Sequence, residues 1–399
     1  MEIKESYIKI GKFLLLSLIL LVLVTSCSND IDPASTCVPP ATDTSGHNPK
    51  AQLYQQVLNK YTGKGIPGIA LLVKDSAGRI WAGSSGYADI QKGVPMEPCH
   101  ISKIASVTKL FIAPLALKLV ELGQLKLENP INTYLPGSIT NKIPNANQVT
   151  LHQLLSHNSG IYDLINNNDF YLAVLNNPQQ DWTQLQLLEY VYNQPAAFAP
   201  GQGPGYSNTN TLLVSLIIDE VVGDHSTLLH NYIINPLYLP NTYYYYHDPM
   251  PQGSIAQGYF DLYNNGSIEN LTNYNTGSGN GYGGIYSTVW DMYTYLNALL
   301  IKKKVLSPAY IDTMLVFPSN ADDGMLLGTG IVKDFINRAP NEYAWGHRGR
   351  DLAYSADLFY FPEKNQIMSL IVNYGTNANS SLLPVFDSLR NEIVDKMMQ

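Results

Sequence analysis

The sequence has little of what nucleic-acid, nucleotide and metal-binding proteins require. Its 24 Lys and Arg residues are outnumbered by 32 acidic residues, and no basic stripe could neutralise phosphates, so nucleic acid is not an expected partner. It contains no GxxxxGK[ST] loop and no Cys/His cluster at metal-ligand spacing, so no cofactor and no metal are expected. With 45% hydrophobic and 14% charged residues, the chain has the composition of a globular protein.

The apolar run over residues 13–24 is too short for a comfortable membrane span. Three lysines precede it and small residues follow, which predicts a secretory signal over residues 1–26. The sequence Val-Thr-Ser-Cys at its end resembles the bacterial lipobox, which implies cleavage before Cys27 and lipidation of its sulfur. An ordinary signal peptide is the alternative. We therefore expect an exported protein anchored by lipid in a bacterial cell envelope, on its periplasmic or surface face.

Only three cysteines occur in the chain. If Cys27 carries lipid, Cys37 and Cys99 remain as an even pair in an oxidising compartment, so a disulfide between them is expected if their Cα atoms lie close enough, and two free thiols are the alternative. Residues 27–48 are rich in Ser, Thr, Pro, Asp and Asn, without periodicity, and predict a flexible tether. The length of the chain allows one large domain or two smaller ones, and we expect residues 49–399 to form one domain.

A serine and a lysine three residues apart, Ser106 and Lys109, form the main catalytic candidate. On a helix this spacing places hydroxyl and amine on one face, where an amine of lowered pKa could take the hydroxyl proton. A serine in the first turn also lies near unpaired backbone N–H groups that favour an oxyanion. A second Ser-x-x-Lys match, at residues 6–9, lies in the predicted signal segment and cannot be catalytic.

The surroundings of this motif resemble a known superfamily. Besides Ser-Val-Thr-Lys, the likeness rests on Pro-Gly-Ile-Ala-Leu-Leu-Val at 67–73, Leu-Leu-Ser-His-Asn-Ser-Gly-Ile at 154–161 and Gly-Gly-Ile-Tyr-Ser at 283–287. From about residue 49 onward the chain resembles the serine β-lactamase and penicillin-binding-protein superfamily, especially its class C β-lactamases, D-Ala-D-Ala carboxypeptidases and esterases. The resemblance implies an α+β fold with an antiparallel sheet built from both chain ends, flanking helices and an inserted all-helical subdomain over about 125–285.

Hydrophobic periodicity gives elements that agree with this architecture. Helices are predicted at 49–61, 106–122, 151–156, 182–192, 208–222, 226–234, 287–300 and 381–398. Strands are predicted at 68–74, 80–87, 344–354, 355–361 and 366–374. Gly123 should end the helix that begins at Ser106.

The second candidate element is Tyr206-Ser207-Asn208. Of three Tyr-x-Asn matches, only this one follows a Gly/Pro-rich loop and opens an amphipathic helix, although a structural tyrosine at a helix start is the alternative. A phenolate beside an ammonium has a lowered pKa and can shuttle a proton, so Tyr206 and Lys109 share the base role here and the choice between them stays open. By resemblance, Asn208 would hydrogen-bond Lys109 and the amide of the acyl group.

The third element is His347-Arg348-Gly349, which starts a predicted strand and is followed by Arg350. By resemblance, the backbone N–H groups of Ser106 and Arg350 would form the oxyanion hole, with Gly349 and both arginines beside the substrate. An ordinary pKa of about 6.5 leaves His347 mostly neutral at pH 7. Strand alternation places Arg348 and Arg350 opposite His347 unless a twist redirects one, which could then hold a substrate carboxylate bidentately.

His157 is the natural candidate for a conventional Ser-His pair, but we reject this role. The resemblance implies a structural turn after a helix, and Gly160 suits a left-handed position there.

The sequence thus predicts a serine hydrolase that forms an acyl-enzyme with peptide amides or esters and most resembles a D-Ala-D-Ala carboxypeptidase. Its partners would be small peptides, peptidoglycan-derived compounds or esters. An esterase or weak β-lactamase is the alternative within the family. A non-catalytic penicillin-binding sensor, acylated without release, is the alternative from another class.

Overall fold

The computed structural model describes residues 47–251, 253–377 and 380–399. The predicted signal peptide, the lipidation site Cys27, the cysteine Cys37 and nearly all of the predicted tether lie outside these residues. Cys99 is disulfide-bonded. Among the described residues, no helix is both long and apolar enough to cross a membrane.

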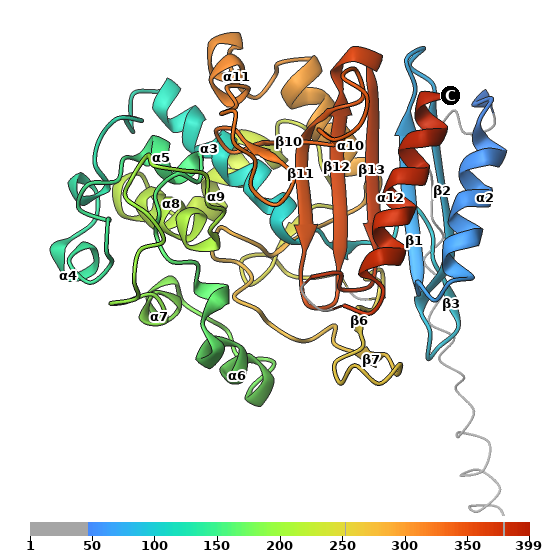
Figure 1. The fold of residues 1–399 in the computed structure, drawn as a ribbon, viewed down its shortest axis with the longest axis horizontal. Coiled ribbons are helices and arrows are strands. Elements are labelled where there is room, and N and C mark those ends of the chain that lie inside the picture. Colours follow the sequence, from blue (N-terminus) through green and yellow to red (C-terminus); the bar gives the residue numbers. More distant parts are fainter. Residues whose placement is uncertain (1–46, 252, 378–379) are drawn as a thin grey trace, which may run out of the picture. The chain divides into compact units, whose positions relative to one another are not determined.

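An eight-stranded antiparallel sheet forms the centre of the fold, and both ends of the chain contribute to it (Figure 1). The first strand, β1, pairs with the last, β13, so that Ile69 lies opposite Val372. This confirms the predicted sheet. In spatial order the strands are β3 (Val94–Pro95), β2 (Ile80–Asp89), β1 (Gly68–Lys74), β13 (Gln366–Val372), β12 (Ser355–Phe361), β11 (Ala344–Arg350), β10 (Val332–Asp334) and β9 (Leu326–Leu327).

The two faces of the sheet lie in separate hydrophobic cores, and strand β1 shows why. Its residues are all buried, with Ala70 and Leu72 in one core and Ile69, Leu71 and Val73 in the other. This alternation follows from the two-residue period of a strand, since a central strand covered on both faces needs apolar side chains at every position.

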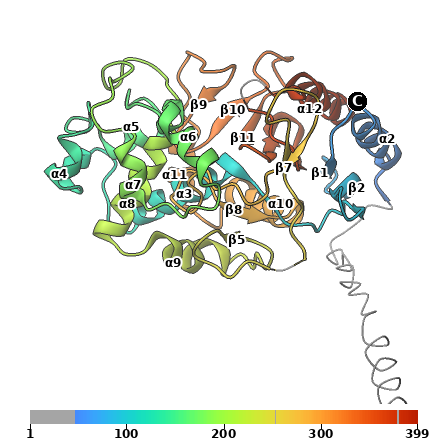
Figure 2. The same cartoon turned by 90° about the horizontal axis from the view of Figure 1, so that it is seen from below.

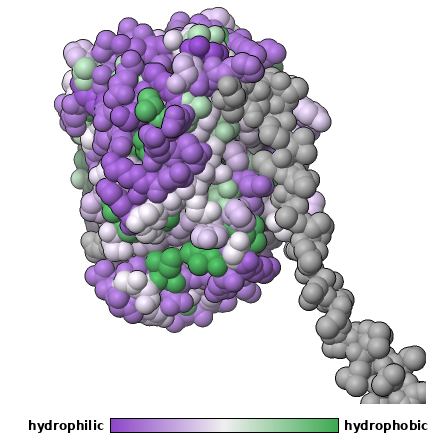
Figure 3. All heavy atoms as spheres, turned by 90° about the vertical axis from the view of Figure 1, so that its right-hand side faces the viewer, coloured by the Kyte–Doolittle hydropathy of each residue, from purple (hydrophilic) through white to green (hydrophobic). Residues whose placement is uncertain are grey.

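Helices α2 (Ala51–Thr62) and α12 (Leu383–Met398) cover one face of the sheet (Figure 1). Tyr54 and Phe386 are buried against it. Seen from this side of the molecule, hydrophilic residues form most of the surface, with a limited band of hydrophobic ones (Figure 3). The two helices therefore bury this side of the sheet and leave a largely polar exterior.

The other face packs against α3 (Lys109–Glu121) and α10 (Val289–Leu296), and the remaining helices extend from there (Figures 1 and 2). They are α4 (Gly137–Thr140), α5 (Leu151–Leu155), α6 (Asn168–Asn176), α7 (Gln184–Glu189), α8 (Asn208–Val221), α9 (His225–Leu229) and α11 (Pro308–Met314). The helices α9 and α10 each continue into a π-helical turn, at His230–Ile234 and Asn297–Ile301.

The inserted region is helical but not purely so, which differs from the prediction. Two short sheets lie in or beside it, one from β4 (Ser102–Lys103), β8 (Ile285–Ser287) and β5 (Tyr243–Tyr244), the other from β6 (Tyr259–Phe260) and β7 (Glu269–Asn270). The Asn/Gly/Tyr-rich segments that form β5 to β7 lack helical periodicity, and tyrosine fits a strand better than a helix interior.

Candidate active site

One cavity of about 350 Å³ is lined by six of the predicted site residues: Ser106, Tyr206, Asn208, His347, Arg348 and Arg350. Lys109 lies beside them and is 1% exposed. These residues come from a turn before α3, from α3 itself, from the start of α8 and from β11, so segments more than 200 residues apart meet here. The structure therefore brings the three sequence motifs together at one place.

The candidate nucleophile Ser106 lies in a 3-10 turn over Ala105–Thr108, and α3 begins only at Lys109. The sequence predicted a helix from Ser106 itself. Ala105 has a φ of +49°, in the left-handed region that side chains other than glycine seldom adopt. Such strained positions gather at functional sites, because the surrounding structure must hold them. The turn presents the Ser106 hydroxyl to the cavity.

Lys109 is held by three hydrogen-bond acceptors. In its ammonium form, Nζ donates to Ser106 Oγ at 2.9 Å, Asn208 Oδ1 at 2.7 Å and the Tyr282 carbonyl oxygen at 2.7 Å. Burial lowers the pKa of Lys109 to about 7, against the opposing charges of Asp163 and Asp351. Near neutral pH the amine is thus partly unprotonated, with its lone pair available to the Ser106 hydroxyl.

The pKa of Tyr206 is raised, whereas the sequence analysis predicted that it would be lowered. Burial raises its pKa above the ordinary value, and the hydrogen bond with Ser106 lowers it only in part. The Lys109 ammonium lies 5.1 Å from the centre of the Tyr206 ring, and this proximity does not outweigh the loss of solvation. The expectation of a lowered pKa was wrong. Tyr206 keeps its proton at neutral pH, which leaves Lys109 as the group able to accept one.

Asp163 is a site residue that the sequence analysis missed. Its Oδ1 accepts a hydrogen bond from the Asn208 backbone at 3.0 Å, and its Oδ2 accepts one from Asn208 Nδ2 at 3.0 Å. This contact orients the Asn208 amide so that its oxygen faces Lys109. Burial raises the pKa of Asp163 to about 6, opposed by the Lys109 charge. A single aspartate in a loop carries no local pattern, so only the fold identifies it.

His157 is not bonded to the candidate nucleophile in this structure. Its Nδ1 accepts hydrogen bonds from the Ser207 backbone and from Asn210 Nδ2, both at 3.2 Å, and its ring stacks on Tyr206 at 4.5 Å. It follows α5 in a turn, and Gly160 has a φ of +67°, where a Cβ would lie 2.0 Å from the Phe198 carbonyl oxygen. The histidine supports the catalytic tyrosine candidate from behind.

His347 is buried and neutral. Burial lowers its pKa to about 3, and the nearby charges of Lys109, Arg348 and Arg350 act in the same direction. Its Nδ1 donates to the Arg348 carbonyl oxygen, and its ring centre lies 6.0 Å from that of Tyr206. This direction agrees with the expectation of a mostly neutral histidine at pH 7, in which the ring contributes hydrogen bonding rather than charge.

Gly349 allows β11 to approach the turn that carries Ser106. A Cβ at this position would lie 2.1 Å from the Ile104 carbonyl oxygen and 3.2 Å from Val107 Cγ2, so no larger residue fits. This close approach sets the strand that contains Arg350 beside Ser106. The oxyanion hole formed by the backbone N–H groups of Ser106 and Arg350 stays a prediction.

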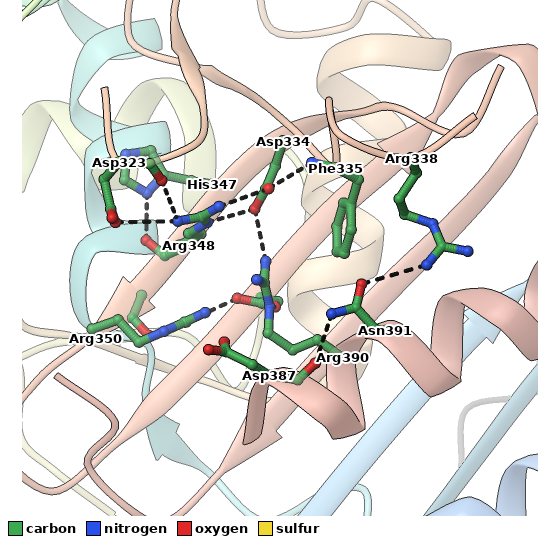
Figure 4. Close-up of polar contacts among 12 residues, drawn as sticks. Asp323, Asp334, Phe335, Arg338, His347, Arg348, Arg350, Asp387, Arg390 and Asn391 are labelled. Atoms are coloured by element: carbon green, nitrogen blue, oxygen red, sulfur yellow. Dashed lines mark hydrogen bonds and ion pairs between the residues drawn. The ribbon is translucent and has the colours of Figure 1, made fainter. Parts of the chain in front are cut away.

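Both arginines of β11 are engaged in ion pairs toward α12, on the face that strand alternation predicts. Arg348 contacts Asp334 with two nitrogens, at 2.6 and 2.8 Å, and Arg350 contacts Asp357 at 2.8 Å. Arg390, from α12, pairs with both carboxylates, and Figure 4 shows it between Asp334 and the helix. Both arginines line the cavity, but each guanidinium is already paired with a carboxylate of the protein.

Four carboxylates also line the cavity. Asp322 and Asp323 line it, and Asp322 accepts a hydrogen bond from the Tyr206 backbone at 2.7 Å. Asp323 is 84% exposed and contacts Arg348 at 3.3 Å. With Asp163 and Asp351 also in the lining, carboxylates outnumber the arginines at this site.

The Ser-Lys and Tyr-x-Asn motifs on which the resemblance rested thus meet in one cavity of this α+β fold. A model of the Beta-lactamase family matches residues 52–383. The chain belongs to this family, within the serine β-lactamase and penicillin-binding-protein superfamily.

Relatives with curated sequences support this membership. The putative penicillin-binding protein PbpX of Bacillus subtilis (strain 168) is 27% identical over 276 residues, which are 68% of this chain and 64% of that protein. Protein flp of Staphylococcus aureus (strain COL) is 30% identical over 179 residues, 44% of this chain. The matched part spans only 34% of protein flp.

Solved structures share the fold at low identity. A D-amino acid amidase from Ochrobactrum anthropi SV3, complexed with L-phenylalanine amide, has a TM-score of 0.76 at 24% identity and covers 87% of this chain and 97% of its own. A penicillin binding protein from Bacillus halodurans has a TM-score of 0.71 at 22% identity, covering 85% and 98%. These similarities establish the fold alone.

Proposed function

We propose that this protein is a serine hydrolase that forms an acyl-enzyme at Ser106, with Lys109 as the general base. The single observation that carries the proposal is the contact of Lys109 Nζ with Ser106 Oγ at 2.9 Å, made by an amine whose pKa is lowered to about 7. A base poised near the working pH is the efficient one for activating a hydroxyl.

The chemistry follows from these positions. Neutral Lys109 takes the Ser106 proton as Oγ bonds to the substrate carbonyl carbon, and the carbonyl electrons move onto oxygen. Two backbone N–H groups would stabilise that oxyanion, each contributing about 3 kcal/mol at such sites. Tyr206, which keeps its proton, donates to the departing amine or alcohol and recovers a proton from Lys109. A water molecule then releases the acyl group by the reverse sequence.

For the substrate, we propose small amides or esters related to peptides, with no free carboxylate next to the reacting bond. A D-Ala-D-Ala carboxypeptidase needs a fixed cation for the terminal carboxylate of its peptide. Arg348 and Arg350 are paired with Asp334 and Asp357, and the cavity lining is rich in carboxylates.

Three substrates test this choice: a D-Ala-D-Ala peptide, its C-terminal amide and a short acyl ester. We expect kcat/KM for the amide or ester to exceed that for the acid by ~10-fold or more, since the acid would place an uncompensated charge in the pocket. Faster turnover of the acid than of its amide would restore the carboxypeptidase interpretation.

The sensor alternative is tested on the same protein. A fluorophosphonate and a fluorescent penicillin should both label Ser106, and the hydrolase releases product repeatedly. Stoichiometric labelling with no turnover of any ester or amide would identify a sensor instead.

We also propose that the protein is exported and lipid-anchored through Cys27, which rests on the signal-like residues 1–26. Mass spectrometry of the full chain expressed in a bacterium should find fatty acid on wild type and none on Cys27→Ala. Wild-type protein without lipid would refute this proposal.

A further inference from the structure

A second cavity, of about 380 Å³, lies next to the catalytic one. Ser278 lines both cavities, so they adjoin at the loop between β7 and β8. Its lining includes two side-chain amides, two tyrosine rings and one lysine: Gln179, Asn273, Tyr274, Tyr286 and Lys103. The mechanism described above uses none of these residues.

One carboxylate separates the two cavities. Asp351 accepts a hydrogen bond from Thr276, in the lining of the catalytic cavity, at 2.7 Å. Its other oxygen pairs at 3.0 Å with Lys103, in the lining of the second cavity. Lys103 precedes Ser106 by three residues, so their Cα atoms are at most about 11 Å apart. Two or three residues of an extended chain could bridge that distance.

Tyr286 offers this cavity a hydroxyl that could bind a ligand. It lies on β8, is 4% exposed and lines the cavity, yet its hydroxyl has no hydrogen-bond partner among the described residues. Pairing of β8 with β4 sets it opposite Lys103, and its ring stacks on Tyr245 at 6.3 Å. The hydroxyl is not among the buried polar atoms that lack a partner, so it is open to solvent, and the cavity that Tyr286 lines gives a ligand access to it. A ligand group there would replace water and contribute one net hydrogen bond.

Lys103 supplies hydrogen-bond donors to the same cavity. Its Nζ pairs with Asp351, and the rings of Tyr286 and Tyr354 lie 6.0 and 5.8 Å away. An ammonium has three N–H groups, so two remain for acceptors on a ligand. A neutral carbonyl suits this position better than a carboxylate, since Asp351 already balances the charge and Asp181 adds a second negative group at the rim.

The rim supplies both donors and acceptors. Gln179 and Asn273 are exposed, and no hydrogen bond to another described residue occupies their side-chain amides. With the Tyr274 ring beside them, they offer amide pairing and an apolar face together, which is what a peptide chain presents in return.

We propose that this cavity is a subsite for an uncharged peptide extension of the substrate, two or three residues from the bond that Ser106 attacks. The proposal rests on the proposed function and adds that substrate length is recognised, with Tyr286 and Lys103 binding a peptide carbonyl.

The test compares esters that share one reacting bond and differ in peptide length on either side of it. We expect wild type to prefer the longer esters. Tyr286→Phe, which removes only the unpartnered hydroxyl, should lower the long-to-short ratio of kcat/KM by about 10-fold, the value of one hydrogen bond. The matched control is Tyr246→Phe at a tyrosine that is 65% exposed and outside the cavity, where the ratio should stay unchanged. A ratio that is the same in wild type and Tyr286→Phe would overturn the subsite.

A binding measurement separates this inference from the proposed function. Calorimetry with N-acetyl-tri-D-alanine amide, an uncharged peptide, uses the Ser106→Ala protein and needs no turnover. Adding Tyr286→Phe should weaken binding about 10-fold. Equal affinity of the two proteins, or no binding to either, would overturn the subsite. Absent ester turnover in wild type would refute the hydrolase and leave the binding result to decide the subsite.

Discussion

The two faces of the central sheet both bury ionisable groups, but they treat them in opposite ways. Toward α12, Asp334 is held between arginines and its pKa falls below the usual range, while that of Arg390 rises. Toward α3, burial moves the pKa of Lys109 to about 7 and that of His347 to about 3, each toward the neutral form. Toward α12 each charge is balanced by a partner that cannot be removed without cost, whereas the shifted pKa values toward α3 are of the kind that gathers at functional sites.

The location of the charges on the strand β11 explains how one element serves both purposes. His347 and Arg348 are neighbours in sequence and point to opposite faces. The arginine joins the strand to α12, and the histidine contributes to the catalytic cavity. The ion pairs on the α12 side of β11 thus fix the position of the strand, and with it the position of His347 in the catalytic cavity.

The largest expected effect is the loss of covalent labelling in Ser106→Ala. The substitution removes the only atom that we expect to bond to the substrate, and alanine, which lacks only the hydroxyl, fits the same 3-10 turn. Gel fluorescence with the fluorophosphonate measures the labelling, and thermal unfolding serves as the control. A variant that labels like wild type would exclude Ser106 as nucleophile.

Lys109→Ala and Tyr206→Phe sharpen the assignment of the base. We expect kcat to fall by ~1,000-fold for the lysine variant and by ~100-fold for the tyrosine variant, within the range of lost acid–base catalysis. The lysine effect is the larger because Lys109, unlike Tyr206, has a pKa near neutral pH. The reverse order, measured by steady-state kinetics at pH 7.5, would make the tyrosine the base.

Arg390→Ala should destabilise the protein, because it disrupts the ion pairs between the sheet and α12. It leaves Asp334 and Asp357 short of a partner, and removing one member of a buried ion pair costs about 3–5 kcal/mol of unfolding free energy. Urea denaturation measures this. The control is Lys60→Ala, whose side chain is 48% exposed and whose pair with Glu392 should contribute less than about 1 kcal/mol. Equal stability of the two variants would show that the network is not structural.

The acid sensitivity of the same network has a fixed direction. Because the pKa of Asp334 is lowered in the folded state, its stabilisation is present above the ordinary pKa of about 3.9 and is lost on further acidification. Urea unfolding at pH 5 and pH 3 should show a larger loss in wild type than in Asp334→Asn. Identical losses would contradict this role.

The smallest expected effect is a shift of a pH profile. In wild type, kcat/KM should rise as Lys109 loses its proton, with a midpoint near its pKa of about 7. The negative charge of Asp163 holds that pKa up, so Asp163→Asn should move the rise to lower pH. A profile that stays in place or moves to higher pH would mean that Asp163 does not act on the base through its charge.

Much of the fold could be read from local patterns. The strands β1, β12 and β13 begin where predicted, because alternating or continuous apolar runs bounded by turn residues depend on short-range sequence alone. The segments α6, α11, β9 and β10 were missed. For α11 a signal existed, since Ser307 and Pro308 form a standard helix start.

The candidate site divides in the same way. Ser106, Lys109, Tyr206, Asn208 and His347 were found through motifs whose spacing is set by one helix turn or one strand residue, and alternation also predicted which way the β11 arginines point.

Only the tertiary structure decided the rest. The pairing of Arg348 with Asp334, the support of Asn208 by Asp163 and the raised pKa of Tyr206 all depend on distances between segments remote in sequence and on how completely they exclude water. A pKa follows the balance between lost hydration and nearby charge, and neither quantity exists until the chain has folded. For this reason the sequence determined which groups could react, and the fold determined their charge and their partners.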